Sequence, residues 1–403
     1  MTDQVEVVNG SQLKVSRSLF FLERFLVSFS MGVFALFPAF LVDIGYTEVF
    51  YGSLSSFGVV FAIGSILLVP IAYMRFGLKN SAPFGALMYA IGSFIVILNV
   101  SAGQPIEAVF YAAVAMQSIG WSVHFTTGSV CIAAVASEDT RAHNFMLYAA
   151  FSTLGLSCGP IFADLGITYA GLDSVGVFWL AVFASLLAFG VSIRAAGMVP
   201  DWSSVSIPNL LDTLDRLPRL VRSPVPVFLV LVFMCACIYT TLIHFQATFA
   251  DANSLSHETF FLFWALGVVG SRFAFGAAIA GMPGSVTLSP LFVGLAVTLV
   301  VLSASAGNPL LYAIAALSLG VTYGLSYPIV QAQAVKFAPP ELRTMTQVLF
   351  SLFYFFGLYA FPLVAGLVIV TITYPGLWIT LGGIALAQAA IAFVTFRKAS
   401  GAA

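Results

Sequence analysis

Charged residues are unusually rare in this sequence. Only 8% of its 403 residues are Lys, Arg, Asp or Glu, and 60% are hydrophobic, whereas soluble domains carry roughly 25% charged residues. A soluble core of this size cannot hide so much apolar surface. We therefore expect lipid to be the main solvent. The composition argues against a soluble enzyme, a nucleic-acid binder with a basic face and a disordered regulator, and the net charge of −1 indicates no bulk electrostatic partner.

Cysteine and nucleotide-binding motifs are also scarce. The four cysteines all lie in apolar runs without disulfide or zinc spacing, so we interpret them as small core residues. No Gly-Lys pair occurs anywhere, which excludes a P-loop in this chain and with it a pump that carries its own nucleotide site. We expect no cofactor and no metal.

Long hydrophobic runs predict an all-α membrane protein with twelve transmembrane helices, each of about 20 residues or more. An even number of spans puts both termini on one side of the membrane. The predicted domains are an N-terminal tail (1–18), an N-terminal six-helix bundle (19–197), a linker (198–222), a C-terminal six-helix bundle (223–397) and a C-terminal tail (398–403). The predicted spans are 19–42, 50–74, 83–100, 107–136, 145–170, 173–197, 223–250, 257–281, 286–306, 309–338, 345–371 and 374–396.

The distribution of charge predicts the orientation. Thirteen of the 15 Lys and Arg residues lie at the side that holds the termini, and the opposite loops and span ends carry only acids such as Asp43, Glu48, Asp251 and Glu258. The positive-inside rule therefore places both termini and the linker in the cytoplasm of a multi-pass protein of the cell (inner) membrane. Within the linker, Ile207, Leu210, Leu211 and Leu214 follow helical spacing, which fits either an amphipathic helix on the membrane face or a plain linker.

The two halves of the chain repeat a short pattern. Arg141 and Arg343 are separated by 202 positions, and so are Gly155 and Gly357, and Pro160 and Pro362. Three coincidences at one offset, close to half the chain length, indicate a duplication. Transporters are commonly built from such repeats, with the substrate site between them.

These motifs resemble the Major Facilitator Superfamily of secondary transporters. The resemblance rests on Gln117-Ser-Ile-Gly120, Glu138-Asp-Thr-Arg141 and Gly155-x3-Gly159-Pro160 in the first half, and on Gly320-x3-Gly324-x3-Pro328, Pro339-Pro-Glu-Leu-Arg343 and Gly357 with Pro362 and Gly366 in the second. It covers nearly the whole chain. It implies two pseudo-symmetric six-helix bundles that move a small molecule by alternating access.

Two of the family's patterns are only partly present. The loop between spans 2 and 3 has Met74 where the family usually has Asp, although Arg75 and Lys79 remain as candidates for the cytoplasmic gate, together with Arg141 and Arg343. Gly155-x3-Gly159-Pro160 resembles the antiporter motif of drug exporters, but Ala163-Asp164 replaces the usual closing Gly-Gly. The resemblance therefore leans towards export.

Arg272 is the most informative single residue, because it falls near the middle of the eighth predicted span. A charge there costs at least about 2.5–3.5 kcal/mol and should face a wet cavity or a partner. Trp264 lies on the same helix face. Monocarboxylate and oxalate carriers of the superfamily look similar, with an Arg in span 8 that clamps the carboxylate of the substrate. The alternative is a structural Arg bound to carbonyls or to a gate acid.

Glu23 and Arg24 sit one turn into the first predicted span. Adjacent helical residues point about 100° apart, so we expect the two side chains to diverge. Arg24 is expected to reach the cytoplasmic surface, and a semi-buried Glu23 could exchange protons, as acids early in span 1 do in several similar proton-coupled carriers. The alternative is a surface-reaching pair near the interface.

Three further groups are candidates for the substrate site. Gln117, Trp121 and His124 share one face of span 4, and an intramembrane His suits proton relay or substrate contact. His244 lies in the outer third of span 7, where packing at an outer gate is the alternative role. Tyr323, Tyr327 and Gln331 form a polar stripe on span 10.

Three classes of function remain open at this point. The first is a proton-coupled carrier of a small molecule, leaning to export of an amphipathic compound, with an organic-anion carrier or an uptake symporter as the alternative. The second, an intramembrane enzyme, needs clustered His and acidic groups, and only His257-Glu258 offers such a pair, in a predicted outer loop. The third is a transporter-derived sensor or scaffold. We expect a monomer in the bilayer that binds no nucleic acid.

Overall fold

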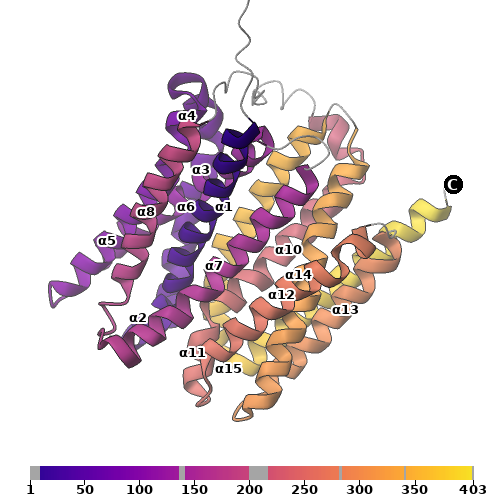
Figure 1. Cartoon of the computed structure of the whole chain (residues 1–403). Helices are drawn as coiled ribbons and strands as arrows, with labels where there is room; N and C mark the ends of the chain where they lie inside the picture. The colour runs from indigo at the N-terminus through magenta and orange to yellow at the C-terminus, as the bar shows by residue number, and fades with distance from the viewer. Residues whose placement is uncertain (1–9, 136–140, 199–216, 281–283, 340–341, 402–403) are drawn as a thin grey trace, which may run out of the picture.

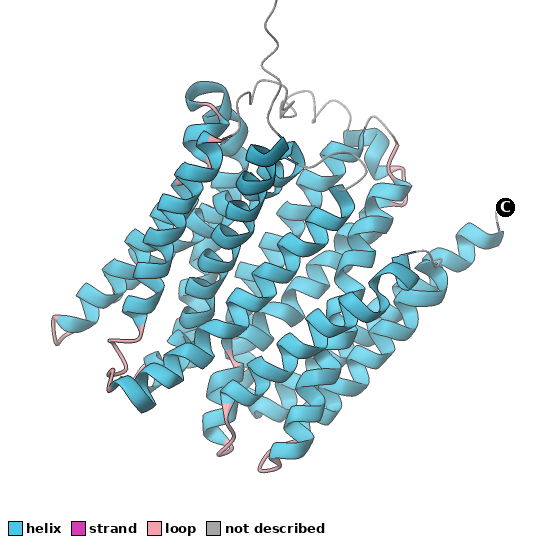
Figure 2. Cartoon of the chain, in the orientation of Figure 1, coloured by secondary structure: helices cyan, strands magenta, loops and turns pink. Residues whose placement is uncertain are grey.

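The computed structural model describes residues 10–135, 141–198, 217–280, 284–339 and 342–401. These are mostly helical, with short connecting loops and no strand (Figure 2). The helices are α1 (Gly10–Val33), η1 (Phe34–Leu36), α2 (Phe37–Asp43), α3 (Glu48–Phe76), α4 (Leu78–Ser81), α5 (Phe84–Ser101), α6 (Glu107–Val135), α7 (Arg141–Ala170), α8 (Phe178–Gly197), α10 (Val225–His244), α11 (Gln246–Ala252), α12 (His257–Ala280), α13 (Gly284–Ser303), α14 (Pro309–Phe337) and α15 (Arg343–Gly401).

Ten of these helical segments are long and apolar enough to cross a membrane. The 59-residue α15 accounts for two passes, because the backbone breaks at Ile372 and Thr373 (φ 67°) and the chain turns back there (Figure 1). α6 has 29 residues, which is also sufficient for a crossing. Twelve passes are therefore consistent with the structure, and the break lies between the predicted spans 345–371 and 374–396.

The helices form two groups of neighbours. In the N-terminal half, α1 packs on α7 and α8, and α5 packs on α6 and α8. In the C-terminal half, α10 packs on α15, α12 on α14, and α13 on α14 and α15. Figure 1 shows the purple first half beside the orange second half. The main contacts between the halves are those of α3 with α15 and of α7 with α12.

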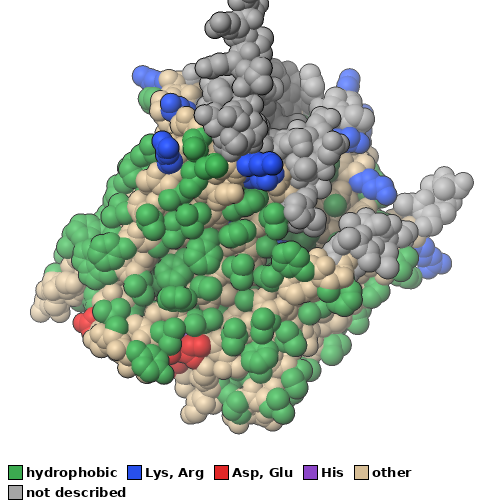
Figure 3. Space-filling model, in the orientation of Figure 1, with side chains coloured by type: hydrophobic (Ala, Val, Ile, Leu, Met, Phe, Trp, Pro, Cys, Tyr) green, Lys and Arg blue, Asp and Glu red, His purple; other side chains and the backbone are tan. Residues whose placement is uncertain are grey.

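Charged side chains gather at opposite ends of the bundle. Lys and Arg lie at the end where the helices meet the grey segments, and Asp and Glu lie towards the other end (Figure 3). We call these the basic end and the acidic end. Between them the outer surface is largely apolar, as fits a hydrocarbon solvent. Side chains such as Val60, Phe183, Val297 and Phe393 are more than half exposed there.

The two halves touch closely near the acidic end. A Cβ on Gly52 of α3 would lie 2.6 Å from the carbonyl oxygen of Pro362, so only glycine permits this approach. The Ser56 hydroxyl donates to the Ala360 carbonyl (3.1 Å), and the Tyr374 hydroxyl donates to Oε1 of Glu48 (3.0 Å). Helices α3 and α15 therefore close the acidic end of the boundary between the halves.

The Gly-x3-Gly-Pro motif lies on α7 against α1. A Cβ on Gly155 would lie 2.2 Å from the Phe25 carbonyl oxygen, and one on Gly159 would lie 2.4 Å from the Val33 nitrogen. The glycines thus allow α7 to approach the helix that carries Glu23 and Arg24. The predicted linker helix (207–214) lies outside the described residues, and His257 begins α12 rather than lying in a loop.

Candidate functional site

Glu23 and His124 come together in the N-terminal half. Oε1 of Glu23 on α1 lies 2.9 Å from Nδ1 of His124 on α6, and the two side chains are 3% and 1% exposed. The remaining Glu23 oxygen and Nε2 of His124 have no hydrogen-bond partner among the described residues. A carboxyl and an imidazole in contact can pass a proton between them.

Arg24 lies in an aromatic cage beside this pair. Its guanidinium carbon is 4.9 Å from each of the ring centres of Trp121, Phe125 and Tyr148. The expectation that Arg24 reaches the surface is wrong, since the residue is only 4% exposed. The packing of α6 and α7 on α1 covers the side chain, and the aromatic faces partly compensate the lost hydration by cation–π attraction. Glu23 and Arg24 diverge by one helical step, yet both face α6.

Arg272 is a half-buried cation of the C-terminal half. Its Nε on α12 donates a hydrogen bond to the Gly324 carbonyl of α14 (3.1 Å), while Nη1 is buried without a partner among the described residues. No described acid forms an ion pair with it. The nearby Trp264 is 1% exposed and packs on Tyr323, with ring centres 5.6 Å apart.

Four tyrosines of the C-terminal half pack ring against ring, and we call them the tyrosine cluster: Tyr239 of α10, Tyr323 and Tyr327 of α14, and Tyr354 of α15. Neighbouring rings in the cluster are 5.4 to 6.4 Å apart, and Tyr354 also stacks on Phe125 of the first half at 6.0 Å. The cluster touches the surroundings of both arginines, because Tyr354 stacks on Phe125 beside Arg24 and Tyr323 packs on Trp264 of the helix that carries Arg272. None of the four hydroxyls forms a hydrogen bond within the described part of the chain, so all remain available to a ligand.

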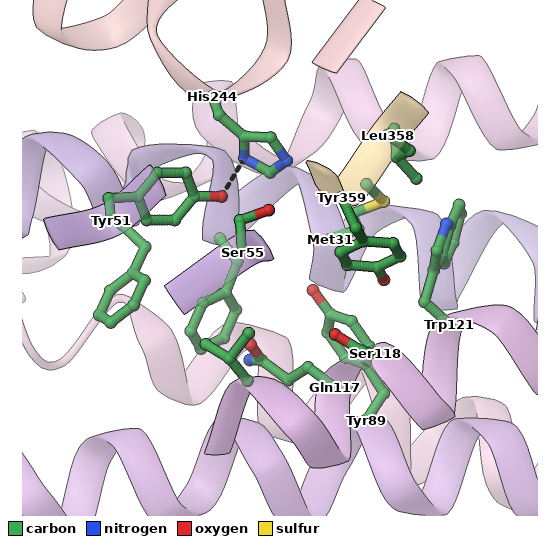
Figure 4. A pocket seen from close by; sticks show the side chains of 13 residues that line it. Met31, Tyr51, Ser55, Tyr89, Gln117, Ser118, Trp121, His244, Leu358 and Tyr359 are labelled. Carbon is green, nitrogen blue, oxygen red and sulfur yellow. Dashed lines mark hydrogen bonds between the residues drawn. The ribbon is translucent and has the colours of Figure 1, made fainter. Parts of the chain in front are cut away.

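A second feature lies nearer the acidic end, where α3, α6, α10 and α15 meet. The Tyr51 hydroxyl lies 2.7 Å from Nδ1 of His244 and joins the two halves there (Figure 4). Gln117 and Trp121 point into the same small cavity, which measures about 50 Å³. That is room for a few water molecules and not for an organic substrate. His244 therefore lies at a closed contact between the halves, near the acidic end.

The remaining predicted residues lie elsewhere. The Gln331 amide donates to Gln347 of the same half (3.0 Å), away from the tyrosine cluster. Arg75, Lys79 and Arg343 are exposed at the basic end and form no ion pair with described residues. Arg141 begins α7. Their role in gating stays a prediction.

Sequence reasoning missed Tyr239 and Tyr354, as well as Phe125, Tyr148 and Tyr51. A mid-span tyrosine carries a usable signal, because its hydroxyl needs a partner inside hydrocarbon. The sequence contains 14 Tyr and 39 Phe, and nothing in it separates those that face the boundary from those that face lipid.

The fold and this arrangement of buried charges between two helical halves define the class. A family model of the Major Facilitator Superfamily matches residues 20–357. The chain belongs to the Major Facilitator Superfamily, and it is a membrane transporter rather than an enzyme. No curated protein matches the sequence.

Solved transporters share the fold at low identity. The peptide transporter POT, in complex with sulfate, has a TM-score of 0.72 at 15% identity and covers 96% of this chain and 94% of its own. The nucleoside transporter NupG gives 0.70 at 14% identity, covering 96% and 99%. The human organic anion transporter MFSD10 (TETRAN) gives 0.63 at 14% identity, covering 94% and 99%.

Proposed function

We propose that this protein is a proton-coupled carrier of a small organic anion. The substrate binds between the halves at Arg272 and the tyrosine cluster, and Glu23 with His124 carries the proton. The basic end faces the cytoplasm of a cell membrane, because positively charged loops are retained on that side. The protein works as a monomer.

One observation carries the choice of an anion: Nη1 of the half-buried Arg272 is itself buried without a partner among the described residues, and no described acid forms an ion pair with the guanidinium. An uncompensated charge at this depth is costly, so the site is complete only with a negative ligand. A carboxylate fits the planar fork of the guanidinium. The tyrosine cluster adds aromatic faces and free hydroxyls for the rest of the molecule.

Proton coupling rests on the contact between Glu23 and His124. The pair is sealed from lipid and from bulk water, and it lies beside Arg24 on the helix against which the Gly-x3-Gly-Pro segment packs. A change in its protonation alters the charge next to the boundary between the halves. Protonation can thereby bias the side of the membrane to which the site between the halves opens.

The direction that we propose is export. The support is the packing of Gly155 and Gly159 on α1. The exporter-like motif thereby contacts the helix that carries Glu23. The unpaired Arg272 favours an anion whichever way it moves, and the amphipathic character of the substrate follows from the aromatic wall.

Transport by purified protein in liposomes tests the proposal. Radiolabelled benzoate and terephthalate are offered with an imposed pH gradient, with the gradient collapsed by an ionophore, and with protein-free liposomes as the control. We expect accumulation of an anion that depends on the gradient, and exchange of the same anion without it. No flux of any organic anion, alongside flux of neutral or cationic amphiphiles, contradicts the anion proposal. Absence of all flux favours a sensor or scaffold.

A further inference from the structure

Two arginines, the buried Arg24 and the half-buried Arg272, lie beside the tyrosine cluster, and neither has an acidic partner in the described part of the chain. Arg24 is 4% exposed, and its Nε and Nη1 have no hydrogen-bond partner among the described residues. Arg272 donates through Nε to the Gly324 carbonyl, and its buried Nη1 has no partner within the described segments. Neither forms an ion pair with a described residue, and Glu23 is engaged with His124 instead.

The aromatic cage holds Arg24 without neutralising it. Trp121, Phe125 and Tyr148 present ring faces at 4.9 Å, and these attract a cation but remove no charge. Phe125 also stacks on Tyr354, so the cage borders the tyrosine cluster directly. Because Phe125 contacts both Arg24 and Tyr354, and Arg272 donates to the Gly324 carbonyl directly after Tyr323, both guanidinium groups border the tyrosine cluster.

The charges of this region can be counted in two protonation states. With Glu23 ionised and His124 neutral, the two arginines leave one net positive charge. When a proton occupies Glu23 or His124, the same groups carry two. The other titratable groups that face the pair are Cys131 of α6 and Tyr148 of α7, with the tyrosine cluster and Arg272 beyond Arg24. A ligand with two negative charges matches the proton-loaded state, because uncompensated charge is costly in a low-dielectric interior.

We infer that Arg24 is a second anion-binding residue and that the substrate is an organic dianion, such as a dicarboxylate, held between Arg24 and Arg272. This inference rests on the proposed function and narrows its substrate class. One carboxylate binds the fork of Arg272, and the other draws the guanidinium of Arg24 from its aromatic cage. The proton on Glu23 or His124 binds together with the dianion.

The test compares ligands that differ by one charge and little in size. Terephthalate and its monoamide, and succinate and its monoamide, are titrated into purified full-length protein by calorimetry. We expect at least one dianion to bind about tenfold or more tighter than its monoamide. We also expect this preference to grow as the pH is lowered, for as long as both carboxylates stay ionised. In Glu23→Gln, which fixes a neutral side chain, the pH dependence of the preference should weaken.

Variants locate the second charge. Arg24→Gln should reduce the preference for the dianion to about twofold or less, Arg24→Lys should restore part of it, and the exposed Arg194→Gln should leave it unchanged. If Arg24→Gln does not fold, as judged by thermal unfolding and gel filtration, the wild-type comparison still decides. A wild type that binds each dianion no tighter than its monoamide overturns the inference, and so does a preference that survives in a folded Arg24→Gln.

The result also separates this inference from the proposed function. If the monoamides bind and Arg272→Gln abolishes their binding, the organic-anion carrier stands and only the dianion is lost. If no anion of either kind binds or moves in liposomes, both fail.

Discussion

The two halves of the molecule handle buried charge in different ways. In the N-terminal half, an acid, a cation and an imidazole meet on facing helices, with Glu23 touching His124 and Arg24 held among aromatic rings. In the C-terminal half, Arg272 is a half-buried charge whose Nε donates to a carbonyl, and Trp264 of the same helix packs on Tyr323. A guanidinium stays charged, whereas a carboxyl or an imidazole can change its charge. The proposed proton site and the proposed fixed anion site therefore lie in different halves.

The largest expected effect comes from removing the fixed charge. Arg272→Gln should lower anion transport by about 100-fold or more, because it removes a charge-assisted contact worth roughly 3 kcal/mol. Arg272→Lys should also lose most of the activity, since an ammonium cannot bind a carboxylate through a planar fork. Initial rates in liposomes measure both, with Arg194→Gln as the matched exposed control. Normal transport rates in Arg272→Gln would show that the C-terminal half does not recognise the anion through this arginine.

The second prediction concerns the half that exchanges protons. Glu23→Gln should abolish accumulation driven by a pH gradient and retain exchange of the anion across the membrane, because the neutral amide can neither take up nor release a proton. Gradient-driven uptake and counterflow are measured on the same liposomes. Full coupling in a folded Glu23→Gln would move the proton site elsewhere, with His124→Gln as the next variant to examine.

A third, smaller effect tests the contact that joins the halves near the acidic end. Gly52→Ala places a methyl group 2.6 Å from the Pro362 carbonyl oxygen, so α3 and α15 must separate. We expect the closed contact to weaken by about 1–3 kcal/mol, as for other overpacked sites. A Ser55→Cys reporter in the small cavity should then react faster with a membrane-impermeant thiol reagent.

Gly64→Ala in the same helix is the control for that experiment, because nothing lies within 4 Å of a Cβ there. The native cysteines are replaced beforehand, so that only the reporter reacts. Equal labelling in Gly52→Ala and Gly64→Ala would show that the outer contact does not limit access.

The smallest predicted effect belongs to the hydrogen bond between Tyr51 and His244. Tyr51→Phe removes its hydroxyl at little cost in volume and should destabilise the closed outer contact by about 1 kcal/mol. Thermal unfolding in detergent and labelling of the same reporter measure the change. Tyr46→Phe is the matched control, because the Tyr46 hydroxyl makes no hydrogen bond in the described structure, and an equal shift in both would argue against an outer latch.

Most of the fold could be predicted from the sequence, because the membrane restricts the choices. Hydrocarbon forces every backbone polar group into a helix, so apolar runs give the spans almost directly. This holds even for the boundary inside α15, because the predicted spans 345–371 and 374–396 leave the break at Ile372 and Thr373 between them.

The candidate site was less predictable, and Arg24 shows why. Its position near the end of an apolar run favoured a side chain that extends to the surface, but the packing of α6 and α7 covers that direction. The contact of Glu23 with His124, 101 positions apart, likewise depends on how α1 meets α6. The place of the outer tyrosine, Tyr51 beside His244, depends on how the two halves meet.

By itself the sequence determined the apolar solvent and the helices, because these follow from hydropathy along the chain. Only the tertiary structure decided which charges find partners. The position of a residue along a helix sets the depth of its Cα in the membrane. Which groups its side chain contacts depends on the helices packed around it. That is why Arg272 could be recognised in advance, and why the cage of Arg24 and its free guanidinium nitrogens could not.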